Sequence, residues 1–319
     1  MKTPRRTFLK KGIAGAAAAG LLPGLIRESG ARTVPARRVG PSRQTMKLAL
    51  SSYSYWHFTE TKTPIEYVID EAAALGLSGV DVLHRQMESE ENEYLQRLKR
   101  HAFKKGVDLI SLSIHQDFVS PDEADRQKHI EHTIHCIELA YQLGIPCIRL
   151  NSGRWNTIQS FDELMAARGV EEPLAGYTEG DAFVWCIDSI EQCLAKAAER
   201  GVLLALENHW GLTSTPEGLL RIRESIDSPW MGLLLDTGNF LEDPYDKLER
   251  VAPYADFVQA KTYYGGGEWY TLDLDYKRIV QILEAAGFEG YISIEFEGRE
   301  KPESGVRKSV ALLREALES

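Results

Sequence analysis

The sequence predicts a single-domain (β/α)8 barrel, and three observations support this. From residue 46 onward, short apolar runs of β-type composition alternate strictly with longer amphipathic patterns, eight of each. Glycines follow the ends of the helical patterns, where a left-handed cap precedes the next strand. The 319 residues, 43% of them hydrophobic, suffice for one full barrel core. Eight strands alternating with eight helices fit one closed parallel barrel over residues 45–319.

The expected strands are short and rich in Val, Ile and Leu, as strands buried on both faces should be. They cover residues 46–52, 79–84, 107–114, 145–151, 201–208, 231–236, 256–262 and 290–296.

The expected helices carry an apolar stripe of helical period, and several begin with a cap-like residue before proline, as at Thr215-Pro216 and Asp243-Pro244. They cover residues 63–75, 91–105, 122–143, 179–200, 215–226, 244–253, 275–287 and 303–318.

An open doubly wound sheet is the alternative fold. It would need a glycine-rich phosphate loop after the first strand, but residues 51–55 read Ser-Ser-Tyr-Ser-Tyr. Two connections are longer or more glycine-rich than barrel loops usually are, at residues 152–178 and 263–270. Each is either a lid over the active face or a mobile surface loop.

Residues 1–44 are read as a twin-arginine signal peptide and linker. Arg5 and Arg6 precede Phe8-Leu9-Lys10, and a weakly apolar run rich in Ala and Gly follows. This pattern resembles a twin-arginine export signal. The apolar run is too short for a permanent membrane span. We therefore expect the twin-arginine export machinery as a partner and a periplasmic or secreted location.

The charge distribution and the cysteines indicate which kinds of ligand and site are to be expected. The first 44 residues carry a net charge of +9, so the overall −10 leaves about −19 on the remainder, which should repel nucleic acid. The four cysteines form no C-x-x-C pair and show no histidine at a zinc-ligand spacing, so we expect buried thiols. His129, His132 and His135 are expected to face solvent. A homo-oligomer is left open.

Acidic and amide side chains stand where four successive strands end. Residues two apart share a face of a strand, and in each of these strands the first polar residue follows apolar or small ones. The four are Glu207, Asp236, Gln259 and Glu295. Three converging carboxylates would repel one another, and a divalent cation resolves the conflict. Hard oxygen donors favour Mn, Mg or Co, with Zn as a further option.

These strand ends resemble the xylose isomerase-like barrel superfamily, and within it the sugar phosphate isomerase/epimerase group. The resemblance rests on Ala-Leu-Glu-Asn-His at 205–209, Leu-Leu-Asp-Thr-Gly-Asn at 234–239, Val-Gln-Ala-Lys at 258–261 and Ser-Ile-Glu-Phe-Glu-Gly at 293–298. It implies a Glu, Asp, His, Glu metal site. Here Gln259 stands in place of the histidine, as in dehydroshikimate dehydratase relatives, and Asn239 stands where many members have a second histidine.

The resemblance implies an isomerase or epimerase of sugars or sugar derivatives. Such enzymes abstract a proton next to a carbonyl and pass through a metal-bound enediolate. Glu207 and Glu295 are the expected catalytic acid and base on either side of the sugar, while Asp236 and Gln259 act only as ligands.

Five further residues are candidates for binding the substrate. His209 shares the inward row of Glu207, and Lys261 could hold developing negative charge or pair with a neighbouring acid. His115 follows the third strand, and Asn151 and Arg154 follow the fourth. A structural role stays open for each of them.

Two other functions remain open. A lyase or dehydratase acting on a keto-sugar, an inosose or a dehydroshikimate-like substrate would use the same metal and base to expel a leaving group. A non-catalytic sugar-binding protein would bind without proton exchange.

Overall fold

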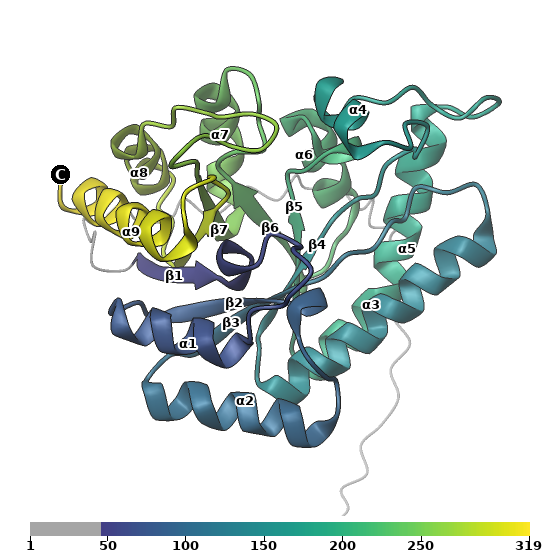
Figure 1. Ribbon diagram of the computed structural model, residues 1–319. Coiled ribbons are helices and arrows are strands. Elements are labelled where there is room, and N and C mark those ends of the chain that lie inside the picture. Colours follow the sequence, from purple (N-terminus) through teal and green to yellow (C-terminus); the bar gives the residue numbers. More distant parts are fainter. Residues whose placement is uncertain (1–45) are drawn as a thin grey trace, which may run out of the picture. The chain divides into compact units, whose positions relative to one another are not determined.

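A computed structural model describes residues 46–319, and they form a closed barrel of eight parallel strands in sequence order (Figure 1). The expected barrel is confirmed, and its domain fills the described residues. The signal peptide and linker expected at 1–44 lie outside them. The strands are β1 Lys47–Ser51, β2 Gly79–Leu83, β3 Asp108–Ser113, β4 Cys147–Leu150, β5 Leu203–Glu207, β6 Met231–Asp236, β7 Ala255–Thr262 and β8 Tyr291–Phe296.

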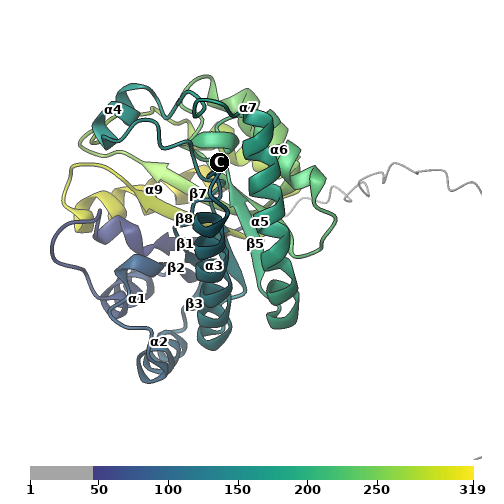
Figure 2. The same ribbon diagram turned by 90° about the vertical axis from the view of Figure 1, so that its right-hand side faces the viewer.

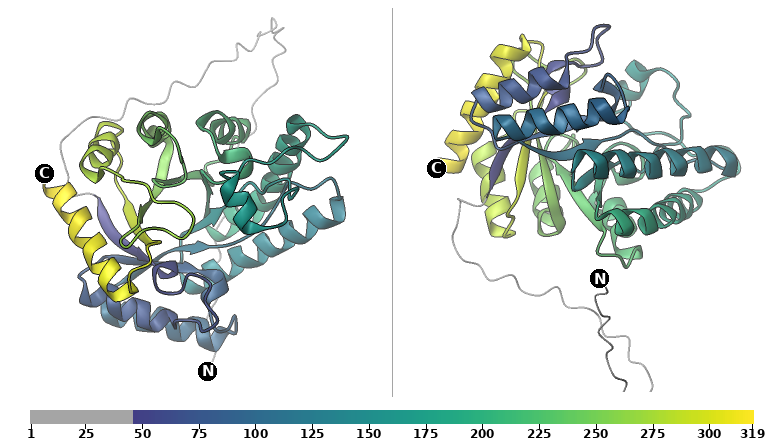
Figure 3. Two further views of the ribbon diagram at one scale, coloured as in Figure 1. Left: turned by 45° about the horizontal axis from the view of Figure 1, so that its top comes forward. Right: turned by 90° about the horizontal axis from the view of Figure 1, so that it is seen from below.

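Helices follow the strands and surround them, as the views in Figure 3 show. The long pair α3 and α5 run side by side along the barrel (Figure 2). The helices are α1 Ile65–Ala74, α2 Asn92–Lys105, α3 Glu123–Leu143, α4 Phe161–Ala166, α5 Glu179–Arg200, α6 Pro216–Ser225, α7 Pro244–Val251, α8 Tyr276–Ala285 and α9 Pro302–Glu318. Among the described residues, no helix combines the length and apolarity needed to cross a membrane.

Most helices begin and end at the capping residues that the sequence predicts. Gly106, Gly144 and Gly201 have positive φ and cap α2, α3 and α5, a conformation that glycine adopts without strain. Thr215 caps α6 by accepting a hydrogen bond from the Gly218 backbone. Asp243 does not behave as expected, because its backbone is left-handed and its side chain caps nothing.

The loop between β4 and α5 contains a helix that sequence reading did not anticipate. Ser160 accepts a hydrogen bond from the Glu163 backbone and starts the short α4. Within residues 46–319 there are also four short 3-10 turns: η2 Ser52–Tyr55, η3 His84–Gln86, η4 Gly211–Thr213 and η5 Ala252–Tyr254.

Two apolar cores hold the barrel together. The larger one packs the outer faces of the strands against the helices. The smaller one fills the barrel interior and includes Ala205, Leu234 and Phe257. Each of these three residues lies two positions before a polar residue of the expected metal set. Since side chains on a strand alternate, Glu207, Asp236 and Gln259 face the interior above a packed apolar floor.

Candidate active site at the C-terminal ends of the strands

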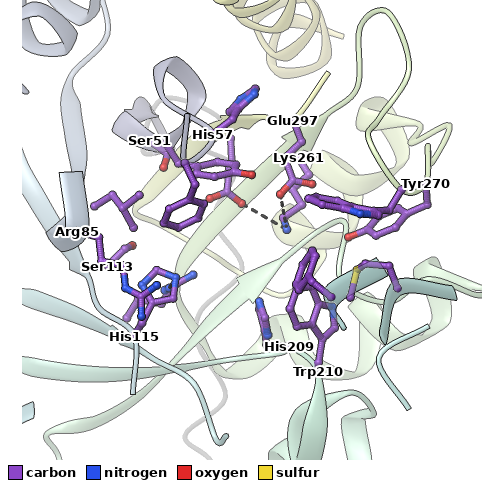
Figure 4. A pocket seen from close by; sticks show the side chains of 18 residues that line it. Ser51, His57, Arg85, Ser113, His115, His209, Trp210, Lys261, Tyr270 and Glu297 are labelled. Atoms are coloured by element: carbon purple, nitrogen blue, oxygen red, sulfur yellow. Dashed lines mark hydrogen bonds and ion pairs between the residues drawn. The ribbon is translucent and has the colours of Figure 1, made fainter. Parts of the chain in front are cut away.

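A cavity of about 410 Å³ opens at the C-terminal ends of the strands, where barrel enzymes place their active sites (Figure 4). Its floor is polar and its walls are largely aromatic. It is lined by Ser51, Tyr53, His57, Phe58, Leu83, Arg85, Ser113, His115, Arg149, Phe161, Met165, His209, Trp210, Lys261, Trp269, Tyr270, Glu295 and Glu297.

Strand register brings the four expected metal ligands to this end of the barrel. Asp236 pairs directly with Gln259 across β6 and β7, and Glu295 pairs with Lys261 across β7 and β8. Glu207 ends β5. All four are buried, with exposed fractions between 0% and 7%. Burial without compensation is costly for three carboxyl groups, so their partners decide what the site can hold.

Two buried oxygens of this set accept no hydrogen bond, Asp236 Oδ2 and Gln259 Oε1. Asp236 Oδ2 has Lys261 Nζ as an ion-pair partner at 3.5 Å, and Gln259 Oε1 has no partner. An unsatisfied buried acceptor carries a desolvation cost that a cation would remove. Gln259 is oriented for this role because its Nε2 donates to Asp81 Oδ2 at 2.8 Å, which leaves its oxygen for the interior. These four side chains supply the oxygen donors that a hard divalent ion prefers, but the oxygens of Glu207, Asp236 and Glu295 do not all lie within 4.8 Å of one another in this structure, so binding one ion would require them to move closer together.

Lys261 places a positive charge among the same acids. Its Nζ lies 3.5 Å from Asp236 Oδ2, 3.5 Å from Glu295 Oε2 and 3.1 Å from Glu297 Oε1. Burial alone would lower the pKa of Lys261, but Asp236 and Glu297 outweigh it and hold that pKa well above its usual value. Lys261 is therefore a fixed ammonium, and Figure 4 shows it pointing into the cavity beside Glu297.

Glu207 is held by three side chains. Arg149 Nη1 lies 3.3 Å from Glu207 Oε2, and Asn151 donates to the same oxygen at 2.9 Å. Asn239 donates to Oε1 at 3.1 Å. The carbonyl oxygen of Asn239 in turn accepts from Lys261 Nζ at 3.0 Å. Asn239 thus links the Glu207 carboxylate to the lysine.

Asn208 joins the ends of β5 and β6. Its Nδ2 donates to the Asp236 carbonyl at 2.9 Å, and its Oδ1 accepts from the Asp236 backbone N–H at 2.7 Å. One side chain therefore satisfies both backbone groups of Asp236 at the point where the main chain of β5 has ended. This fixes the position of Asp236 relative to the neighbouring Glu207.

Burial shifts the pKa values of the titratable side chains at the floor of the cavity. Desolvation raises the pKa of Glu295 to about 7, with Lys261 opposing the rise and Glu297 adding to it. A carboxyl group that titrates near neutrality can both accept and return a proton. Desolvation also lowers the pKa of His209 well below its usual value, and the charge of Arg149 acts in the same direction. His209 is therefore neutral at physiological pH.

Aromatic rings from two loops form the outer wall. Phe161, at the start of α4, contacts Trp269 edge-on with a centroid separation of 4.7 Å and Trp210 at 5.2 Å. Trp269 Nε1 also donates to Asp162 Oδ1 at 3.0 Å. The loops at residues 152–178 and 263–270, which the sequence left as lids or surface loops, meet each other here over the cavity.

The five expected substrate-binding residues divide into three groups. His115, His209 and Lys261 line the cavity. Asn151 lies beneath it and holds Glu207. Arg154 is not a lining residue, because its guanidinium is paired with Glu171 at 2.7 Å inside the loop. The structure does not bring Arg154 to the site.

Sequence reasoning missed several residues of the site. Arg149 and Asp81 are buried polar residues inside strands, and a period-two count would have found both on inward rows. Arg149 falls two positions before Asn151, and Asp81 two after Gly79. Glu297 continues the inward row of Glu295, and Trp269 belongs to the glycine-rich connection at residues 263–270. Tyr53 in the turn η2 and Trp210 after β5 were missed, because periodicity carries no signal there.

The fold and the site define a (β/α)8 barrel with a buried acidic and amide cluster at the C-terminal rim. A family profile for the xylose isomerase-like TIM barrel matches residues 69–316. The chain belongs to this family. A search of curated protein sequences returned no significant match.

Similar solved structures have low sequence identity and full-length coverage. D-psicose 3-epimerase from Clostridium cellulolyticum H10 has 15% identity and a TM-score of 0.67, covering 86% of this chain and 100% of its own. 3-Keto-D-glucoside 4-epimerase from E. coli has 15% identity and a TM-score of 0.66, with coverage of 85% and 99%. The probable 3-DHS dehydratase from Bacillus anthracis has 17% identity and a TM-score of 0.62, with coverage of 84% and 99%. At such identities these likenesses show the shared fold.

Proposed function

We propose that the chain is a divalent-metal-dependent isomerase or epimerase of sugars or sugar derivatives. The observation that carries the proposal is the buried Gln259 Oε1, which has no hydrogen-bond partner, at the rim that also holds the carboxyl groups of Glu207, Asp236 and Glu295. Membership of the xylose isomerase-like family and the epimerases among the similar structures support it.

The four oxygen-bearing side chains would hold Mn²⁺, Mg²⁺ or Co²⁺. When bound, such an ion polarises a carbonyl oxygen and so acidifies the neighbouring C–H. Glu207 and Glu295 come from β5 and β8, and we assign them to removing and returning the proton. The raised pKa of Glu295 suits this exchange near neutral pH.

The remaining floor residues orient the substrate. Lys261 offers a permanent ammonium to a hydroxyl, a carboxylate or developing negative charge. His209 and His115 are both neutral because burial lowers their pKa values, so each can donate or accept a hydrogen bond with a substrate hydroxyl. The aromatic wall suits the apolar face of a sugar ring.

The test combines metal content with proton exchange. Elemental analysis of purified protein should find bound Mn, Mg or Co. Ketohexoses, inososes, 3-keto-glycosides and dehydroshikimate are then incubated in D₂O and followed by NMR. Incorporation of deuterium at one carbon without loss of water supports epimerisation. Loss of water identifies the lyase or dehydratase alternative, and tight binding without exchange identifies a sugar-binding protein.

Glu295→Gln provides the matched variant. It should keep the fold and lose turnover by roughly 10²- to 10⁴-fold, because it removes the proton-transferring group. Glu303→Gln, on the exposed surface of α9, is the control and should retain activity. Full turnover in Glu295→Gln would contradict the role assigned to Glu295.

We also propose that the chain is exported through the twin-arginine pathway with its metal already loaded. Support comes from Arg5, Arg6 and the run that follows them. Fractionation of cells that express the chain with both arginines changed to lysine should show loss of export. Unchanged export of that variant would refute this route.

A further inference from the structure

Two histidines and a cysteine converge outside the cavity, between the turn that follows β2 and helix α3. They are His84, which begins η3 directly after β2, and His132 and Cys136, which lie one turn apart on α3. One ligand atom from each lies within 4.8 Å of the other two. Among residues 46–319 this is the single group of three or more His, Cys, Asp or Glu side chains that meets this distance.

The spacing within the cluster is close to that of a metal site. Cys136 Sγ lies 4.0 Å from His84 Nδ1 and 3.7 Å from His132 Nε2. Around a tetrahedral zinc ion, bonds of about 2.3 Å to sulfur and about 2.0 Å to nitrogen place these atoms about 3.6 Å apart. Small shifts of Cys136 Sγ, together with a rotation of the His132 ring that turns one nitrogen toward the ion, would therefore close the site.

The alternative, a plain thiol–imidazole hydrogen bond, explains the arrangement less well. Cys136 Sγ is almost equally far from both nitrogens of His132, at 3.7 and 3.9 Å, so it faces neither lone pair directly. Its separation from His84 stands at the outer limit of a hydrogen bond to sulfur. Cys136 is fully buried, so it has no access to water in place of a partner.

Glu90 supplies the outer support that metal-binding histidines usually have. Its Oε1 lies 2.7 Å from His84 Nε2, and its Oε2 lies 2.7 Å from His135 Nε2. The Glu90 carboxylate accepts a hydrogen bond from Nε2–H of His84, and this tautomer leaves the lone pair of Nδ1 on the side of Cys136. The orientation of His84 is thus set by a residue that would not itself touch the ion.

We propose that His84, His132 and Cys136 bind a borderline-soft divalent cation, Zn²⁺ first, with water in the fourth position. Two imidazoles and one thiolate favour such an ion over Mg²⁺ or Mn²⁺. Binding releases the thiol proton of Cys136 to solvent and involves no redox step. This centre shares no side chain with the barrel-mouth site, whose ligands are oxygen donors.

A bound ion would tie the turn after β2 to α3. In η3, His84 is followed by Arg85, which lines the cavity. By fixing His84, the ion would restrict the movement of the backbone that carries Arg85. The expectation that Cys136 is a buried thiol is confirmed. His132, which was expected to face solvent, is only partly exposed and lies against Cys136. The two residues are four apart on one helix face, a spacing that suits joint ligation.

Cobalt gives a readout that separates this centre from the barrel mouth. The full-length protein is stripped with a chelator and titrated with Co²⁺. A thiolate-to-cobalt charge-transfer band should appear, because the barrel-mouth set contains no sulfur. The band should vanish in Cys136→Ser and in His132→Gln. It should persist in Cys193→Ser, another buried cysteine, and in Asp236→Asn, which damages the barrel mouth instead.

Zinc affinity provides the second measurement. Glu90→Gln should weaken Zn²⁺ binding at this centre by roughly 10- to 100-fold, the usual effect of losing such outer support. His132 is only partly buried, so His132→Gln is expected to fold even if Cys136→Ser does not. Absence of the band in the parent protein, or its survival in His132→Gln, would overturn the proposal.

Discussion

Asp81 on β2 fixes the amide of Gln259 on β7, on the far side of β1 and β8 in the closed sheet: Gln259 Nε2 donates to Asp81 Oδ2 at 2.8 Å. The second oxygen of Asp81 accepts from Ser113 Oγ at 2.9 Å. Burial raises the pKa of Asp81 to about 6, so it is mainly ionised at neutral pH and can only accept hydrogen bonds. The amide oxygen of Gln259 is therefore the group left for a metal.

Asp81→Asn is expected to weaken metal binding at the barrel mouth. Asparagine can present either its oxygen or its amino group, so the Gln259 amide loses its fixed orientation. Calorimetric titration with Mn²⁺ should show affinity reduced by roughly 10- to 100-fold. Ser113→Ala is the control, because it leaves the acceptor for Gln259 intact. Equal losses in both variants would contradict the orienting role.

Lys261→Gln should shift the acidic limb of the profile of kcat/KM against pH to higher pH. The ammonium of Lys261 opposes the effect of burial on Glu295, so its removal raises the pKa of that carboxyl above its present value of about 7. If Glu295 acts as the base, half-maximal kcat/KM shifts to higher pH. A bound cation changes the starting value and leaves the direction of the shift the same. The measurement is kcat/KM against pH.

The control for that profile is Lys308→Gln, which removes a lysine whose partner is Glu300 on the surface. Its profile should match that of the parent protein. A downward shift in Lys261→Gln would rule out the electrostatic coupling between Lys261 and Glu295.

Trp269→Ala should raise KM more than it lowers kcat. Trp269 is 47% exposed, contacts Phe161 and forms part of the wall rather than the floor. Loss of an aromatic contact worth about 0.5–1.5 kcal/mol corresponds to roughly a 2- to 10-fold change in KM. Trp269→Phe should recover part of the effect. Phe103→Ala, an 85% exposed residue on α2, should change neither constant.

Gly305→Ala should destabilise the fold. A Cβ at Gly305 would stand 2.4 Å or closer to two ring atoms of the buried Phe296, so α9 would have to move away from β8. Such overpacking costs about 1–3 kcal/mol. Gly180→Ala in α5 meets only Thr178 Oγ1, at 3.4 Å, and should be neutral or stabilising by up to about 1 kcal/mol. Urea unfolding of both variants measures the difference.

Periodicity carried most of the fold prediction. Eight apolar runs and the glycines between them were sufficient to predict the barrel. A strand buried on both faces requires a short apolar run, and a left-handed helix cap favours glycine, so both can be recognised in the local sequence. The short α4 was missed, since six residues carry too few turns for a period to show. Asp243 was misread because its backbone turn, rather than its side chain, determines the start of α7.

The site was predictable wherever it lies on strands. Glu207, Asp236, Gln259 and Glu295 were located by counting in twos. Contacts between segments that are distant in the sequence could not be found by counting. Asp81 and Gln259, which are hydrogen-bonded, lie 178 positions apart. His84, in the turn after β2, and Cys136, on α3, are likewise brought together only by the tertiary fold.

The Asn208 side chain makes the two hydrogen bonds to β6 that the backbone of a longer β5 would otherwise make. A carboxamide carries one donor and one acceptor at nearly the spacing of a peptide group, so Asn208 continues strand pairing without continuing the strand. The chain after Glu207 is therefore free to leave the sheet and place His209 and Trp210 in the lining of the cavity. Loops at this edge can change in length and composition while the two acidic residues beneath them stay in place.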